Sequence, residues 1–241
     1  MARRRWIADE VSGRRAALTG SHADHLIRVL RVRVGQEFEV SAGSLVYRAR
    51  VAAVADHRVE FELEEELSAS RLAQITLIPA IIKFDRMEWG IEKCTEIGVS
   101  RFIPFVAARS DTHLASAAAK RAERWRRIAR EASEQSRRSS PPQIADPVKL
   151  KDVIALSGGT RIFLSESEQS MTLIAALQTQ AKEDDLFLAV GPEGGWTESE
   201  EKLFRDCGWI SASLGPTILR AETAAIVAAA TATQLRMTIG E

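Results

Sequence analysis

The stretch DLFLAVGPEGGWTESE, residues 185–200, joins an apolar run, a glycine-rich turn and the start of a helix. The run LFLAV at 186–190 has no polar residue, as is typical of a strand buried on both faces of a parallel sheet. Thr197 and Glu200 have the spacing of a capping box, which predicts that a helix begins after Thr197. Strand, turn and helix in this order indicate an α/β domain.

The same rhythm recurs from residue 74 to the last residue. Apolar runs predict strands at 75–82, 101–107, 161–167, 185–190 and 209–215, and helical spacing predicts helices at 85–98, 117–136, 171–178, after Trp196 and over 221–237. In the first helix Met87, Ile91 and Cys94 form one apolar stripe, and Gly98 is expected to end it. The buried side of the long helix is expected to hold Ala118, Ala122, Trp125, Ala129 and Ala132. Strands that alternate with helices predict a mostly parallel sheet covered on both faces.

The first 70 residues have a different pattern. Segments 36–43, 45–54 and 58–67 alternate apolar and polar residues, as half-buried strands do. One helix is predicted over 21–32, with Leu26, Val29 and Leu30 on a shared face. The sequence thus predicts a small barrel-like domain at 1–70, a linker at 68–74 and an α/β domain at 74–241.

Composition limits the function classes. The chain has 241 residues, 45% hydrophobic and 27% charged, which is typical of a soluble globular protein. There is no apolar run of about 18 residues, so no membrane span is expected, and the basic start MARRRWIADEV lacks the apolar segment of a secretory signal. Cys94 and Cys207 match no zinc or redox spacing, so we expect no metal and a reduced, cytoplasmic compartment.

The net charge is zero, but the charges are segregated. Residues 1–33 hold eight arginines against three acids, and residues 109–138 hold nine basic residues against four acidic ones. The segment EFELEEEL at 60–67 is strongly acidic. This distribution allows a basic face that contacts phosphate, although solvated helix and strand surfaces would give the same pattern.

Three predicted strands end in loops that can bind a ligand: FLSES at 163–167, LAVGPEGG at 188–195 and ASLGPTILRAET at 212–223. Because the carboxyl ends of parallel strands share one edge, these loops are expected to form one pocket. No phosphate-binding glycine motif is present, and Glu193 would repel phosphate. Glycines also favour any strand-to-helix turn. An acidic loop with open backbone groups suits a neutral or cationic ligand such as S-adenosylmethionine.

Five stretches together resemble one family. The pair GPEGGWTESE at 191–200 and LGPTILRAETAA at 214–225 is similar to the signature of the small-subunit ribosomal RNA uridine-N3 methyltransferases, in the SPOUT superfamily of trefoil-knotted methyltransferases. HADHLIRVLRVRVGQEF at 22–38, KFDRMEWGIEKCTEIGVSRFIPF at 83–105 and EASEQSRRSSPPQI at 131–144 extend the resemblance across both predicted domains in the family's order.

The resemblance implies a PUA-like N-terminal β-barrel that binds RNA, a knotted parallel-sheet methyltransferase domain and a homodimer. It implies transfer of a methyl group from S-adenosylmethionine to N3 of a uridine in 16S ribosomal RNA, with the small ribosomal subunit as partner. Two alternatives stay open: a SPOUT enzyme that acts on another RNA such as tRNA, and a non-catalytic RNA-binding factor in ribosome assembly.

The resemblance also implies which residues bind the cofactor. They are Leu164, Glu166, Gly191, Pro192, Glu193, Gly195, Leu214, Gly215, Ile218, Leu219, Arg220, Thr223 and Ala224. The chain departs from the family pattern at Ser165, Thr217 and Ala221, where the family often has histidine, a basic residue and threonine. These departures leave the glycine loop intact.

Methylation of uracil N3 requires loss of the N3 proton, after which negative charge spreads to the carbonyl oxygens. Arg220 is expected to stabilise that charge, and Glu222 to orient Arg220 or to accept the proton. Alternatively, the two form a structural surface pair. A cysteine-adduct route is rejected, because Cys94 and Cys207 resemble small hydrophobic residues.

Binding of RNA requires arginine and lysine contacts to phosphates. The expected contacts are Arg28, Arg31, Arg33, Lys83, Arg86, Arg109, Arg137 and Arg138.

Overall fold

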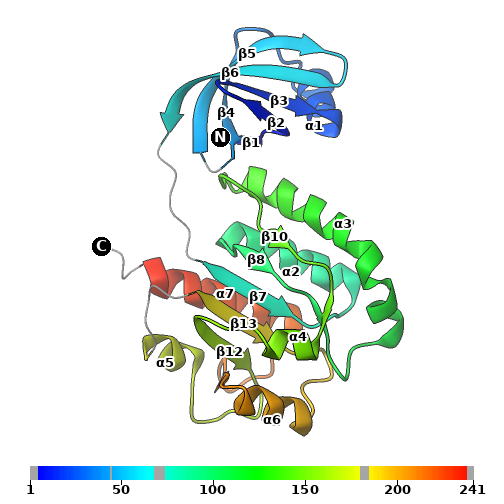
Figure 1. The fold of residues 1–241 in the computed structure, drawn as a ribbon, viewed down its shortest axis with the longest axis vertical. Helices are drawn as coiled ribbons and strands as arrows, with labels where there is room; N and C mark the ends of the chain where they lie inside the picture. The colour runs from blue at the N-terminus through cyan, green and yellow to red at the C-terminus, as the bar shows by residue number, and fades with distance from the viewer. Residues whose placement is uncertain (1–4, 44, 68–73, 180–184, 238–241) are drawn as a thin grey trace. The chain divides into compact units, whose positions relative to one another are not determined.

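The computed structural model describes residues 5–43, 45–67, 74–179 and 185–237 (Figure 1). The chain divides into two compact units, Met1–Arg71 with Arg130–Pro141, and Leu72–Ala129 with Pro142–Glu241. The expected boundaries at 70 and 74 did not anticipate that the segment 130–141 groups with the first unit. Nearly all of the expected linker at 68–74 lies outside the described residues.

The first unit is built on one curled, six-stranded sheet in the order β1-β4-β5-β6-β3-β2. The β1–β4 pair is parallel, and the other neighbours are antiparallel. Its strands are β1 (Trp6–Ile7), β2 (Glu10–Ser12), β3 (Arg15–Thr19), β4 (Glu37–Ala42), β5 (Leu45–Ala55) and β6 (Arg58–Leu67). The sheet order ends at β1 and β2, so the described residues form a half-barrel, and the expected PUA-like β-barrel is not confirmed.

The predicted helix over 21–32 is shorter and partly of another type. Helix α1 (Gly20–Asp24) continues into a π-helical turn, η1 (His25–Val29). Leu26 is buried, but Val29 and Leu30 are 64% and 49% exposed, so the expected shared apolar face is wrong. The reason is that a π-helix turns more widely than an α-helix, so residues three and four apart no longer align.

The second unit contains a six-stranded parallel sheet in the order β10-β8-β7-β13-β12-β14. Its strands are β7 (Ile75–Pro79), β8 (Arg101–Phe102), β10 (Gln143–Ile144), β12 (Thr160–Leu164), β13 (Leu186–Val190) and β14 (Ile210–Ala212). This confirms the α/β prediction and places the ends of β12, β13 and β14 at one edge of the sheet.

The single strand predicted at 101–107 is instead two short strands. β8 pairs with β7, whereas β9 (Phe105–Val106) pairs with β11 (Val148–Lys149) in a separate two-stranded sheet. Pro104 lies between them and has no N–H to donate to a ladder, which accounts for the break.

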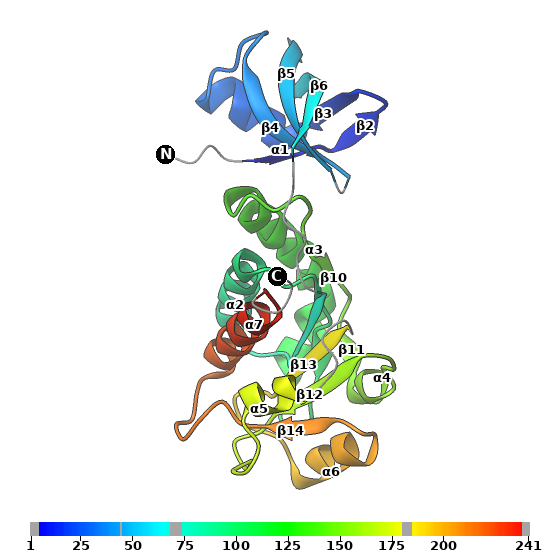
Figure 2. The ribbon, with the colours of Figure 1, turned by 90° about the vertical axis from the view of Figure 1, so that its left-hand side faces the viewer.

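Helices cover both faces of the large sheet. Ile75, Leu77, Leu186 and Leu188 belong to one hydrophobic cluster, and their neighbours Ile78, Phe187 and Ala189 belong to another, as strand alternation requires. The first cluster includes residues of α2 (Phe84–Ile97), α3 (Thr112–Gln135), α5 (Leu173–Gln178) and α7 (Ala221–Met237), and the second includes residues of α4 (Leu150–Ile154) and α6 (Glu198–Asp206). Figure 2 shows α2 and α7 on one side of the sheet and α4 on the other.

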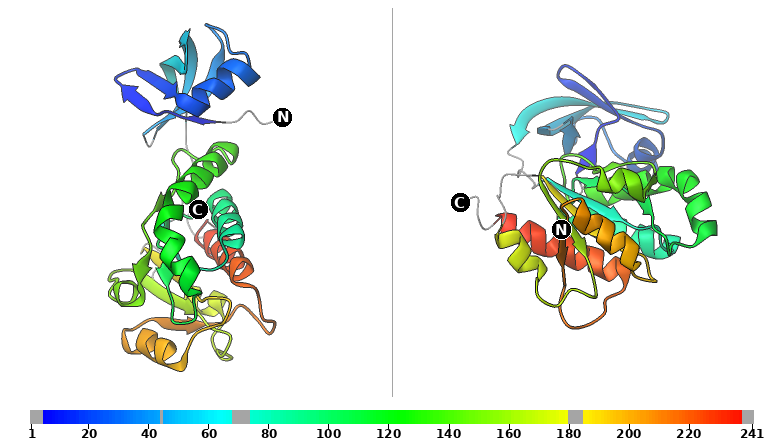
Figure 3. Two further views of the ribbon diagram at one scale, coloured as in Figure 1. Left: turned by 90° about the vertical axis from the view of Figure 1, so that its right-hand side faces the viewer. Right: turned by 60° about the horizontal axis from the view of Figure 1, so that its bottom comes forward.

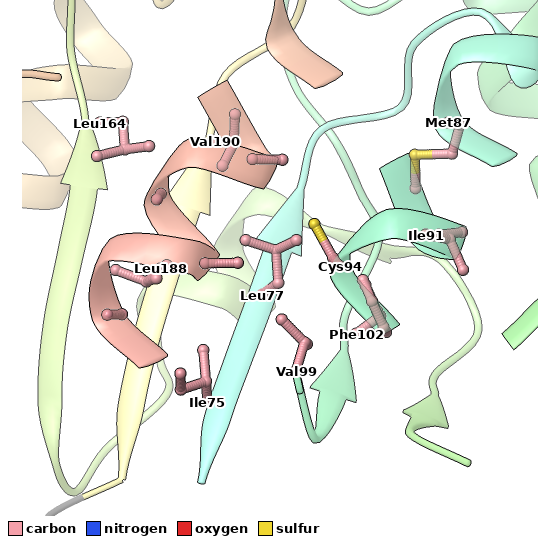
Figure 4. Packing of buried hydrophobic residues seen from close by; sticks show 14 of the residues in the cluster. Ile75, Leu77, Met87, Ile91, Cys94, Val99, Phe102, Leu164, Leu188 and Val190 are labelled. Carbon is pink, nitrogen blue, oxygen red and sulfur yellow. The ribbon is translucent and has the colours of Figure 1, made fainter. Parts of the chain in front are cut away.

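The predicted helix faces agree with the structure. Met87, Ile91 and Cys94 of α2 are buried, and α2 ends at Gly98 with φ 121°. The five residues named for the long helix are all buried, and Trp125 is fully so. Figure 4 shows Cys94 of α2 beside Leu77 of the sheet, and α5 lies beside α7 in the right view of Figure 3.

Candidate functional site

The loops that follow β12, β13 and β14 line one pocket of about 320 Å³. This volume lies within the range of small-molecule sites. The predicted cofactor residues in its lining are Leu164, Glu166, Gly191, Pro192, Glu193, Gly195, Leu214, Gly215, Ile218, Leu219, Arg220 and Ala224. Thr223 is absent from this lining, and Glu222 lines a smaller apolar recess beside it.

Trp196 fixes the glycine loop to the neighbouring strand. Its indole Nε1 donates to the carbonyl of Leu164 at 2.6 Å, and its ring stacks on Phe105. A Cβ on Gly191 would lie 3.0 Å from Trp196 Cε2, so the loop backbone packs directly against the indole. Gly195 has φ 68°, a conformation that glycine adopts without strain. The glycines therefore have structural reasons to be here as well as a position on the pocket.

The predicted capping box is present at the start of α6. The Thr197 side chain accepts from the backbone N of Glu200, and the Glu200 carboxylate accepts from the backbone N of Thr197. Glu200 is buried and also accepts from the backbone N of Ala108 at 2.7 Å. The cap thus ties the glycine loop to the segment that precedes α3.

The acid of the glycine loop has a cationic partner. The Arg86 guanidinium, on α2, donates to the Glu193 carboxylate, and Arg86 Nε lies 3.8 Å from Glu222 Oε1. Glu222 is 6% exposed, and its Oε2 has no hydrogen-bond partner among the described residues. Arg86, which the sequence suggested as an RNA contact, thus lines the pocket as the partner of two carboxylates.

Arg220 and Glu222 differ in their surroundings. Arg220 is exposed at the pocket, directly before α7, and its side chain makes no hydrogen bond or ion pair within the described part of the chain. Glu222 faces Arg86. The expected orienting contact between Glu222 and Arg220 is thus missing from the described residues.

A hydrogen-bonded network supports the loop after β12. Ser165 is buried and donates to Glu201 Oε1 at 2.5 Å, and the Ser167 hydroxyl donates to the same carboxylate. Burial would raise the pKa of Glu201, but the hydrogen bonds of Ser165 and Ser167 and the Arg205 guanidinium outweigh it and lower the pKa. The serine that departs from the family pattern therefore connects this loop to α6.

The remaining basic residues are dispersed. Arg28, Arg31, Arg33 and Lys83 are exposed. Arg109 donates to loop carbonyls, and Arg137 donates to Glu39. Arg138 is 8% exposed, and its Nε donates to the Ser140 carbonyl at 3.3 Å. Burial lowers the pKa of Arg138 to about 10. A guanidinium this buried does not offer a surface contact to phosphate, so we do not propose Arg138 as an RNA contact.

Sequence reasoning missed several lining residues. They are Arg86, Ser165, Val190, Trp196, Ser213, Pro216, Thr217 and Ala221. Most are neighbours of predicted residues in the same three loops, so loop membership would have found them. Arg86 comes from a different element, and no local pattern indicates that α2 reaches this pocket.

Neither cysteine lies at the site. Cys94 is buried, and burial raises the pKa of its thiol to about 12. In the described part of the chain, no group of three or more His, Cys, Asp or Glu side chains is arranged to hold a metal ion. Nor does any described helix have the length and apolar character to cross a membrane.

Comparison with known proteins gives a consistent result. The model of the RNA methyltransferase domain family matches residues 69–233. The ribosomal RNA small subunit methyltransferase E of Bacillus subtilis is 31% identical over 222 residues, covering 88% of this chain and 87% of that protein. Its counterpart from Synechocystis is 35% identical over 218 residues, covering 88% of this chain and 71% of that protein.

Solved structures match nearly the full length of the chain. The crystal structure of a ribosomal RNA small subunit methyltransferase E from Neisseria gonorrhoeae bound to S-adenosyl methionine has a TM-score of 0.84 and 30% identity, covering 96% of this chain and 97% of that one. A putative methyltransferase from Legionella pneumophila in complex with the same cofactor also has a TM-score of 0.84, with 26% identity and 98% coverage of both chains. The pocket formed by three loops of the parallel sheet agrees with these matches. The family model and these relatives show that the chain belongs to the RNA methyltransferase family, among the relatives of ribosomal RNA small subunit methyltransferase E.

Proposed function

We propose that this protein transfers a methyl group from S-adenosylmethionine to N3 of a uridine in 16S ribosomal RNA. The observation that carries the proposal is that the three loops line one shared pocket, with glycine backbone and the carboxylates of Glu166 and Glu193 in its lining. Relatives named as ribosomal RNA small subunit methyltransferases support the RNA class. Uridine N3 rests on the sequence resemblance.

The pocket fits the proposed cofactor. Leu164, Leu214 and Leu219 give it apolar walls suited to an adenine ring, and Gly191 and Gly195 bring the backbone of the glycine loop to the pocket. Of the two carboxylates in the lining, Glu193 is paired with Arg86, and Glu166 is compatible with a nearby sulfonium or α-amino group. The residues proposed to hold the cofactor are the predicted ones that line the pocket. Thr223, in the first turn of α7, stays a proposed cofactor residue on the sequence resemblance alone.

When bound, S-adenosylmethionine supplies a methyl group on a good leaving group. The protein's main task is then to hold the acceptor nitrogen in line with that methyl group. Uracil N3 carries a proton at neutral pH, and loss of that proton places negative charge on the carbonyl oxygens. Arg220, exposed at the pocket and unpaired among the described residues, is suited to donate hydrogen bonds to such an oxygen.

The surroundings of Glu222 do not favour the expected roles of orienting Arg220 or accepting the N3 proton. Its carboxylate is buried beside Arg86 and absent from the main pocket lining. Direct transfer of the uracil N3 proton to Glu222 is therefore disfavoured. We propose that Glu222 orients Arg86, which in turn holds Glu193. The proton of N3 then passes to solvent or to a group of the RNA.

Further features are proposed from the resemblance. They are a trefoil knot in the methyltransferase domain, a PUA-like role in RNA binding for the curled N-terminal sheet, a homodimer and a cytoplasmic location. The exposed side chains of Arg28, Arg31 and Arg33 support the RNA role, since surface arginines favour phosphate. The proposed substrate context is the small ribosomal subunit.

The decisive experiment offers isotope-labelled S-adenosylmethionine with small ribosomal subunits, free ribosomal RNA and tRNA from cells that lack the enzyme. Labelled nucleosides are then identified by mass spectrometry. N3-methyluridine in the ribosomal samples alone supports the proposal. Label in tRNA or in another base contradicts it, and absence of both label and cofactor binding favours an assembly factor.

Arg220 is tested in the same assay. Arg220→Ala should lower the methylation rate by about 10²–10³-fold, the effect of removing one donor to a developing oxyanion. Arg220→Lys keeps the charge and should recover part of the rate. If Arg220→Ala methylates at the rate of the unmodified protein, the assigned role is wrong.

A further inference from the structure

Arg109 makes contacts that differ from those of an RNA-binding arginine. It lies in the segment between β9 and α3, and its Nη1 donates to the carbonyl of Gly194 at 2.8 Å and to the carbonyl of Trp196 at 3.1 Å. Both acceptors belong to the glycine loop. One guanidinium nitrogen therefore holds two carbonyls on either side of Gly195, which has φ 68°.

The stem of Arg109 also packs on the loop. A Cβ placed on Gly194 would lie 3.3 Å from Arg109 Cβ and 3.4 Å from its Cδ. The 3.3 Å contact is tighter than most Cβ contacts, so a methyl group on Gly194 would displace the Arg109 side chain by a few tenths of an ångström. Gly194 itself is absent from the pocket lining, whereas Gly191 and Gly195 are present.

The segment that carries Arg109 is itself anchored. Ser110 Oγ donates to the carbonyl of Ile81 at 3.0 Å, and the backbone N of Ala107 donates to the same hydroxyl. The backbone N of Ala108 donates to buried Glu200 at 2.7 Å. Arg109 thus extends from a segment held by these hydrogen bonds to the carbonyls of the glycine loop.

We propose that Arg109 is a positioning residue, which holds the loop from Gly191 to Trp196 in its ligand-binding conformation through the carbonyls of Gly194 and Trp196. This inference rests on the proposed function, because the ligand of the loop is taken to be S-adenosylmethionine. If the loop also adopts conformations that cannot bind the cofactor, only a fraction of the protein is able to bind. The measured cofactor affinity is then reduced in proportion to that fraction. Loss of a charged donor should therefore appear in cofactor affinity, in the absence of RNA.

The test measures S-adenosylmethionine affinity by calorimetry without RNA, for the unmodified protein, Arg109→Ala, Arg109→Lys and Arg101→Ala. Arg101 is an exposed arginine of the same unit without a side-chain contact in the described residues, so it controls for charge. Arg109→Ala should bind about 10- to 100-fold more weakly, the effect of a hydrogen bond from a charged group. Arg109→Lys should recover part of the affinity, and Arg101→Ala should match the unmodified protein.

A second pair of measurements separates positioning from RNA contact. RNA affinity is measured against salt concentration, and Michaelis constants are determined for cofactor and RNA. Positioning predicts a raised Michaelis constant for the cofactor with an unchanged salt slope. Unchanged cofactor affinity with a shallower salt slope would make Arg109 a phosphate contact and overturn the proposal.

Gly194→Ala keeps the proposal testable if Arg109→Ala fails to fold. The added methyl group pushes the Arg109 stem away, so cofactor affinity should fall in the same direction while the arginine charge remains. If Gly194→Ala folds and binds with unchanged affinity, the positioning role of Arg109 is contradicted. If the unmodified protein does not bind S-adenosylmethionine, it is the proposed function that fails.

Discussion

Arg86 and Glu193 form an ion pair at the edge of the pocket, between helix α2 and the glycine loop. The loop carries an acid in a place where other glycine loops bind phosphate, and a cation from a distant part of the chain balances it. Arg86 Nε also lies 3.8 Å from Glu222, which is 6% exposed at the start of α7. One guanidinium thus links α2 to the glycine loop and to the start of α7.

Removal of Arg86 should destabilise the protein through Glu222. Arg86→Met leaves a buried carboxylate without its nearby cation, and we expect the free energy of unfolding to fall by about 1–3 kcal/mol. Urea denaturation checks this value. The control is Glu222→Gln in the same background, which removes the uncompensated charge and should restore part of the loss. Additive effects of the two substitutions in a double-mutant cycle would contradict a direct interaction.

Gly191→Ala should weaken cofactor binding through Trp196. The new Cβ would lie 3.0 Å from an indole that is fixed by its hydrogen bond to Leu164 and by stacking on Phe105. Overpacking costs roughly 1–3 kcal/mol, so the affinity measured by calorimetry should fall about tenfold or more. Trp196→Phe in the same background removes the clashing atoms and should recover part of the affinity. A lack of recovery would mean that Gly191 is needed for another reason.

Local sequence patterns were sufficient for much of this fold and for the backbone of the site. The buried stripes of α2 and α3, the cap at Thr197 and the three pocket loops depend on spacing within one segment, and each was predicted. The break at Pro104 was not predicted, because an apolar run does not reveal which neighbour its ladder pairs with. The exposure of Val29 also depends on a change of helix type that periodicity does not encode.

The roles of the arginines could not be predicted for a related reason. Arg86, Arg109 and Arg138 were expected to contact RNA because such binding requires arginine contacts to phosphates, and the last two lie in the basic segment 109–138. In the structure the first two meet acceptors more than 80 residues away in the sequence, and the third is buried. A basic residue's partner is fixed by tertiary contacts, so composition identifies the charge without identifying what it binds.

The loop after β12 should lose stability in acid through Glu168. Hydrogen bonds from the side chain and backbone N of Ser170 lower the pKa of Glu168 to about 2. A carboxylate with a lowered pKa contributes stability that is fully present above its unfolded pKa of about 4.3 and is lost as pH falls toward 2. Glu168→Gln should therefore be less stable than the unmodified protein at pH 7, with a difference that vanishes across this range.

Urea unfolding of both proteins between pH 7 and pH 2.5 measures that difference. Ser170→Ala is the matched variant, because it removes the hydroxyl donor and leaves the carboxylate in place. It should reproduce part of the loss at pH 7. A difference between Glu168→Gln and the unmodified protein that stays constant with pH would show that Glu168 acts without its charge.

Cys94 provides a direct test of the thiol route to base methylation. Its side chain is buried between α2 and the sheet, and burial raises the pKa of the thiol to about 12, so almost no thiolate forms at neutral pH. Cys94→Ala should keep its methylation rate within about twofold after allowance for folded protein, because Cys94 is not among the residues that line the pocket. Cys94→Ser should be less stable by about 1–3 kcal/mol, since it buries a hydroxyl without a partner. A rate that falls at least a hundredfold in Cys94→Ala, with unchanged stability and cofactor affinity, would instead require a covalent role for the thiol.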